Sequence, residues 1–131
     1  MTMYDAASRD LPFEVSLYES VLARDPDNVE ALIALGEAFT RKGDYVRGLE
    51  IDQRLSRLRP SDAVVRYNLA CSLALLGRAD EAFEALGQAV DQGYRDLKHL
   101  DADADLASLR EDPRFAALRE RVLKPAPSRT A

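Results

Sequence analysis

The sequence predicts an all-α protein made of paired antiparallel helices. Two observations carry this prediction: the composition, and an internal period of 34 residues. The 131 residues include 20 Ala and 19 Leu, two of the best helix formers, and only 7% aromatic residues. Few β-branched residues remain to build a sheet. The hydrophobic fraction of 47% is enough for the packed core of one domain or a short repeat array.

Residues of the same type recur 34 positions apart along the middle of the chain. The recurring pairs are Pro26 and Pro60, Gly43 and Gly77, and Leu35 and Leu69. Glycine suits the left-handed residue that ends a helix, and proline stops a helix from continuing. The period therefore indicates that one helix–turn–helix unit is repeated.

The first predicted helix spans about residues 11–24. Asp10 caps it, and Pro12 lies in its first turn, where proline is well tolerated. In a paired arrangement this helix lacks the partner that would precede it, so we expect its apolar stripe to face an absent neighbour. The stripe consists of Leu11, Val15 and Tyr18. Either Met3 and Tyr4 fold back over it, or a second copy of the chain docks there as a weak homodimer.

The next two helices are expected at about 29–42 and 45–58. Asp27 and Asn28 can cap the first of them, and its apolar residues recur at steps of three and four. Gly43 follows, where a left-handed residue is needed.

A further pair is predicted at about 61–76 and 79–92. Pro60 ends the preceding helix, and Gly77 and Gly93 end the two helices of this pair. The result is a series of antiparallel helices with short connections.

At these positions the sequence resembles the tetratricopeptide repeat family, whose period is 34 residues. A half-repeat within 1–28 precedes two full copies, at 29–62 and 63–96. The matching positions of the first copy are Leu32, Leu35, Gly36, Phe39, Gly43, Tyr45, Gly48, Leu55 and Pro60. The second copy departs from the family pattern at Arg66 and Tyr94. The resemblance implies a right-handed α-solenoid of helix hairpins that binds a protein or peptide partner.

Residues 97–124 break the period and resemble a divergent closing element. We expect a short helix near 104–111 and a final helix at 113–123. Their apolar residues should cover the open end of the second copy: Leu106, Leu109, Phe115 and Leu118. The Pro-rich tail, 125–131, is expected to be disordered.

The resemblance also implies a concave groove lined by the first helix of each copy. By position, its partner-binding residues are Glu30, Ile33, Glu37, Arg41, Val64, Tyr67, Asn68 and Cys71. Tyr67 would contribute contact area, and Asn68 could pair with a peptide backbone. The alternative is that the closing segment packs into this face and fills it.

Composition argues against nucleic-acid binding and membrane insertion, and it indicates a cellular compartment. With 18 Lys and Arg against 23 Asp and Glu, the net charge of −5 does not suit a nucleic-acid binder. No apolar run approaches the roughly 20 residues of a membrane helix. The single cysteine suits a reducing compartment, so we expect a cytoplasmic location.

No constellation for catalysis, a cofactor or a metal is predicted. Four carboxylates follow the spacing of a calcium loop: Asp101, Asp103, Asp105 and Asp112. Leu106 stands where that loop needs glycine, so we interpret them as helix caps and turn residues. Cys71 and His99 are the only Cys and His, but a mid-helix cysteine has no free backbone donor for an oxyanion, so we interpret Cys71 as a small apolar residue. The sequence thus predicts a non-enzymatic interaction module, with a self-assembling structural protein as the alternative.

Overall fold

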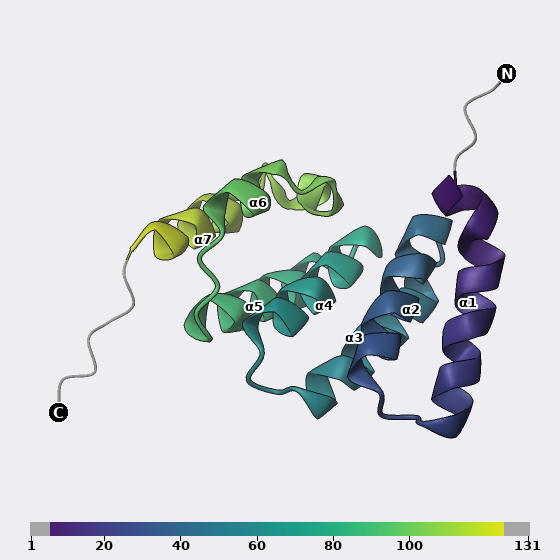
Figure 1. Ribbon diagram of the computed structural model, residues 1–131. Coiled ribbons are helices and arrows are strands. Elements are labelled where there is room, and N and C mark those ends of the chain that lie inside the picture. The colour runs from purple at the N-terminus through teal and green to yellow at the C-terminus, as the bar shows by residue number, and fades with distance from the viewer. Residues whose placement is uncertain (1–5, 125–131) are drawn as a thin grey trace, which may run out of the picture. The chain divides into compact units, whose positions relative to one another are not determined.

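The computed structural model describes residues 6–124, with side chains from Leu11 onward, and every regular element in this range is a helix (Figure 1). This confirms the predicted all-α class. The helices form two compact units, which divide between Leu58 and Arg59. The predicted fold-back of Met3 and Tyr4 and the predicted disorder of 125–131 lie outside the described residues.

The first unit contains α1 (Ala6–Arg24), α2 (Val29–Lys42) and α3 (Tyr45–Leu58). Helix α2 packs against both of its neighbours. The buried apolar residues of α2 and α3 are Ala31, Leu32, Leu35, Ala38, Phe39, Leu49 and Leu55. At Gly36 the two helices approach so closely that an added Cβ would lie 3.2 Å from Ile51 Cγ2. The bounds of α2 and α3 agree with the prediction.

Helix α1 begins earlier than the sequence predicted. It starts at Ala6, so Pro12 lies inside the helix and Asp10 is a helical residue rather than its cap. One proline removes a single N–H donor, and the residues before it include strong helix formers, such as Ala6 and Ala7. The helix therefore continues through the position at which the pattern suggested a start.

The second unit contains α4 (Ala63–Leu75), α5 (Ala79–Asp91), α6 (Leu97–Ala102), the 3₁₀-helix η1 (Ala104–Leu109) and α7 (Pro113–Leu123). Helices α4 and α5 form a tightly packed pair. The 3₁₀-helix η1 packs on α4, while α7 packs on α5 and α6. The sequence did not predict α6.

The closing residues are part of the core of the second unit. All four that were expected to cover the second copy are buried: Leu106, Leu109, Phe115 and Leu118. Leu100 of α6 is buried with them. Helix α4 is consequently enclosed on more than one side, and its buried residues are Val65, Tyr67, Ala70, Cys71, Ser72, Leu73 and Ala74.

Helix ends follow the predicted chemistry. The Asn28 side chain accepts a hydrogen bond from Ala31 N at 2.9 Å, and Gly43 ends α2 with φ 85°. Gly77 and Gly93 also have positive φ, at 76° and 110°. Within the described residues, no helix combines the length and apolar character that a membrane crossing requires.

Candidate functional site

The face of α4 that was predicted to line a groove is covered within its own unit. Tyr67 is 2% exposed and Cys71 is 7% exposed. The 3₁₀-helix η1 packs on α4, and the Ser108 hydroxyl lies 3.5 Å from the Ala74 carbonyl oxygen. The closing segment therefore packs on the part of this helix that carries Tyr67 and Cys71.

This burial corrects the prediction that Tyr67 and Cys71 contact a partner. The physical reason is that Leu106, on the covering segment, gains more from burial on α4 than from exposure to water. Val64 remains exposed and Asn68 is half-buried, so a partner role for these two residues stays a prediction.

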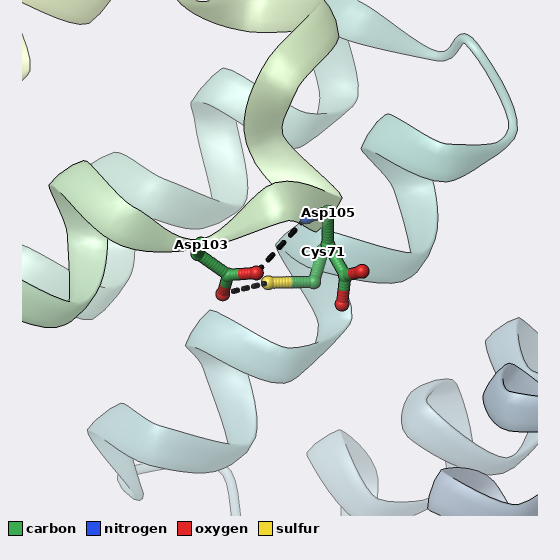
Figure 2. Close-up of side chains that lie close together, drawn as sticks. All are labelled: Cys71, Asp103 and Asp105. Atoms are coloured by element: carbon green, nitrogen blue, oxygen red, sulfur yellow. Dashed lines mark hydrogen bonds between the residues drawn. The ribbon is translucent and has the colours of Figure 1, made fainter.

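Asp103 is the centre of the contacts between the closing segment and α4. It precedes η1, and its Oδ1 atom accepts a hydrogen bond from Asp105 N at 3.0 Å. Its Oδ2 atom accepts a hydrogen bond from the Tyr67 hydroxyl at 2.6 Å. The same atom accepts from Cys71 Sγ at 3.5 Å (Figure 2). His99 Nε2 lies 3.3 Å from the same oxygen. One carboxylate thus joins two helices and the turn between α6 and η1. We call these five residues the Asp103 cluster.

Aromatic rings extend the Asp103 cluster. Tyr67 and Tyr94 stack with ring centroids 4.4 Å apart and planes within 4° of each other. The His99 ring is tilted against Tyr67 at a centroid distance of 5.5 Å. The Tyr94 hydroxyl is buried, and no described residue gives it a hydrogen-bond partner.

The protonation of the Asp103 cluster follows from burial. Burial, reinforced by the Asp103 carboxylate, raises the pKa of the Cys71 thiol well above its usual range. Burial also raises the pKa of Tyr67 strongly and that of Tyr94 to about 12. The neighbouring Tyr67 hydroxyl acts in the opposite direction and lowers the pKa of Tyr94. The geometry between the two hydroxyl groups is nevertheless not that of a hydrogen bond. Cys71 is consequently a protonated hydrogen-bond donor rather than a thiolate nucleophile.

The remaining acidic residues of the calcium-like series have separate roles. Asp101 forms hydrogen bonds of 2.6 and 2.9 Å with Arg119. Asp112 caps α7 and forms an ion pair of 2.8 Å with Arg114. Asp112 therefore agrees with the interpretation as a cap, whereas Asp101 lies within α6.

The outward face of α2 carries the other predicted groove residues. Glu30, Glu37 and Arg41 are exposed, and Ile33 is half-buried. Arg41 Nη2 lies 2.6 Å from the Glu14 carboxylate of α1, so its charge is paired. This face therefore presents two exposed carboxylates around an apolar residue.

The N-terminal stripe is not an uncovered surface. Leu11 is 7% exposed and Val15 and Tyr18 are half-buried, because α1 packs on α2. The prediction that these residues face an absent neighbour is therefore wrong for Leu11. The large apolar residues that α1 exposes are Phe13 and Leu17, at 69% and 44%.

The roles of Asp103 and Tyr94 could not be assigned from the sequence. Asp103 was predicted only as one of several turn carboxylates. Tyr94 carried a signal, since it stands where the repeat family usually has proline. A bulky aromatic residue at that position marks the place where the chain leaves the repeat and returns over α4.

Comparisons with known proteins identify relatives for part of the chain. No family model matches it. It is 34% identical to a chloroplastic protein of Arabidopsis thaliana over 86 residues, which are 63% of this chain and 26% of that protein. It is also 34% identical over 71 residues to Superkiller protein 3 of Schizosaccharomyces pombe, matching 54% of this chain and 5% of that protein. The chain spans about a quarter of the first relative and a twentieth of the second.

A solved structure extends the similarity to most of the fold. The chain superposes on MamA MSR-1 C2 with a TM-score of 0.65 and 23% sequence identity. The match covers 89% of this chain and 68% of that one.

The paired helices, the glycine-ended turns and these similarities define an all-α protein of helix-hairpin repeats. This is the fold that the resemblance to the tetratricopeptide repeat family implied, and the chain shares it with MamA MSR-1 C2.

Proposed function

We propose that this chain is a non-enzymatic interaction module whose partner-binding surface is the outward face of α2. The observation that carries this proposal is the contrast between two helices. The face of α4 is covered by the closing segment, whereas α2 leaves Glu30 and Glu37 exposed with Ile33 between them. The part of the predicted groove that remains accessible therefore lies in the first unit.

The chemistry of this face favours a partner with basic and apolar side chains. Glu30 and Glu37 are two turns apart on α2, and Ile33 lies on the same side. Arg41 adds no free positive charge because Glu14 pairs with it. A helix or extended peptide with Lys or Arg on either side of one apolar residue would be complementary in charge and polarity.

The chemistry of the Asp103 cluster supports a non-enzymatic role. Its thiol donates to Asp103, and burial raises the pKa of this thiol well above its usual range, which disfavours the thiolate that nucleophilic catalysis needs. The cytoplasmic location that the single cysteine indicates stays a prediction.

Photo-crosslinking tests the proposed surface. A benzoylphenylalanine placed at Glu37 should capture the partner in cells, while the same residue at Glu50, exposed on α3, should not. With the captured partner purified, Glu37→Lys should weaken binding at least about tenfold through charge reversal at the contact, and Glu50→Lys should leave the Kd unchanged. Equal capture at both positions, or equal Kd values, would reject the α2 face.

The self-association alternative is less favoured by the exposure of its residues. In its stripe, Leu11 is buried and Val15 and Tyr18 are half-buried, which leaves less apolar surface for a second copy. We therefore favour binding to a different protein over a homodimer.

A further inference from the structure

Three potential metal ligands of different chemistry converge beside Asp103. Cys71 Sγ and one carboxylate oxygen each from Asp103 and Asp105 all lie within 4.8 Å of one another. They come from α4 and from the turn that begins η1, so packing of η1 on α4 holds them together (Figure 2). His99 Nε2 adds a fourth donor atom at the edge of this group.

Two of the interatomic distances already suit a tetrahedral ion. Typical zinc bond lengths of about 2.0–2.3 Å place neighbouring ligand atoms roughly 3.3–3.5 Å apart in a tetrahedron. Asp103 Oδ2 lies 3.5 Å from Cys71 Sγ and 3.3 Å from His99 Nε2. Both distances share one oxygen of Asp103, and the Asp105 and His99 side chains would move to complete a tetrahedral set.

A second observation, independent of the ligands, also indicates a missing partner. The Tyr94 side chain is 8% exposed, yet its hydroxyl has no hydrogen-bond partner among the described residues. Its ring stacks in parallel on Tyr67, whose own hydroxyl reaches Asp103. A water or a carboxylate oxygen bound to an ion at this place would give the Tyr94 hydroxyl the partner that buried polar groups normally have.

We propose that Cys71, Asp103, Asp105 and His99 bind a divalent ion of the zinc type. A mixed set of thiolate, imidazole and carboxylate suits zinc or cobalt, whereas calcium and magnesium prefer oxygen ligands alone. On binding, the Cys71 thiol releases its proton to solvent as the metal–sulfur bond forms. Tyr67 remains hydrogen-bonded to Asp103 and orients that carboxylate from outside the coordination shell.

Cobalt titration of the full chain, purified with a chelator that is then removed, tests the proposal. We expect one Co²⁺ per chain, with a thiolate-to-cobalt charge-transfer band in the near ultraviolet and visible d–d bands of tetrahedral intensity. Zn²⁺ should displace the cobalt and raise the Tm by several degrees.

Matched variants distinguish Co²⁺ binding at this site from unspecific Co²⁺ binding to surface carboxylates. Cys71→Ser should abolish the charge-transfer band, and Asp105→Asn should weaken Co²⁺ binding at least tenfold. Asp91→Asn, the same change on the exposed surface of α5, should have no effect. Circular dichroism establishes that each variant is folded.

Two outcomes would overturn the proposal. One is the absence of any cobalt band together with an unchanged Tm in Zn²⁺. The other is cobalt binding that survives unchanged in Cys71→Ser or Asp105→Asn, which would place the ion on other carboxylates.

Discussion

The Tyr67 hydroxyl donates a hydrogen bond of 2.6 Å to the Asp103 carboxylate across 36 residues of sequence. This bond links the middle of α4 to the turn between α6 and η1. Because the acceptor is an ionised carboxylate in a largely buried setting, the bond is of the stronger, charge-assisted kind.

Removing that hydroxyl should destabilise the protein. In metal-free buffer, we expect Tyr67→Phe to lower the free energy of unfolding by about 1–3 kcal/mol, the usual range for a hydrogen bond to a charged group. Urea unfolding followed by circular dichroism measures it. Tyr94→Phe is the matched control: it deletes a hydroxyl without a partner among the described residues, so stability should stay the same or rise. An equal loss in both variants would show that ring packing, not the bond to Asp103, is responsible.

The turn after α2 should tolerate only residues that adopt positive φ. Gly43 has φ 85°, and nothing lies within 4 Å of a Cβ built on it, so any penalty comes from the backbone. We expect Gly43→Val to cost about 1–3 kcal/mol of stability. Gly43→Asn should cost clearly less, since asparagine visits this region more readily. Thermal melts compare the two, and equal Tm values would contradict the backbone explanation.

The packing of α1 on α2 predicts different effects at two neighbouring positions. Tyr18→Glu introduces a charge into the half-buried interface and should speed hydrogen exchange of the α1 amides. Leu17→Glu changes the outward face and should leave exchange nearly unaltered. If Tyr18→Glu instead leaves exchange unchanged but abolishes concentration-dependent sedimentation, the stripe mediates self-association after all.

Acid should remove the contribution that two surface ion pairs of the second unit make to the stability of the folded protein. The hydrogen bonds from Arg119 lower the pKa of Asp101, and those from Arg114 lower the pKa of Asp112. A carboxyl whose folded pKa is lowered stabilises the protein at neutral pH and loses that effect as pH falls through its lowered pKa. The difference in urea midpoint between wild type and Arg119→Gln should therefore shrink as pH falls below 3.8. A difference independent of pH would point to lost side-chain packing instead.

Much of the fold could be predicted because its signals are local. The repeat period and the residues at helix ends placed α2 and α3 correctly, and the closing leucines were correctly expected in the core. Helix α6 was missed because its six residues are too few to display a helical period. The start of α1 was missed because proline favours the first turn of a helix, whereas α1 continues through Pro12.

The candidate site was less predictable for a different reason. Helical spacing indicates that Tyr67 and Cys71 share a face, but it does not indicate what covers that face. The covering segment begins beyond Tyr94, and its decisive contacts come from Asp103, whose type suits any turn. Contacts between segments so far apart in sequence depend on packing that no local pattern encodes.

The enclosure of α4 also has a consequence during synthesis on the ribosome. The hairpin of α4 and α5 emerges before η1, which packs on α4, and before α7, which packs on α5. For the time needed to translate the intervening segment, the face of α4 that η1 covers is exposed and prone to association with other nascent chains or with chaperones. The second unit should therefore acquire its native stability only after Phe115 and Leu118 have left the exit tunnel, whereas the first unit can fold while translation continues.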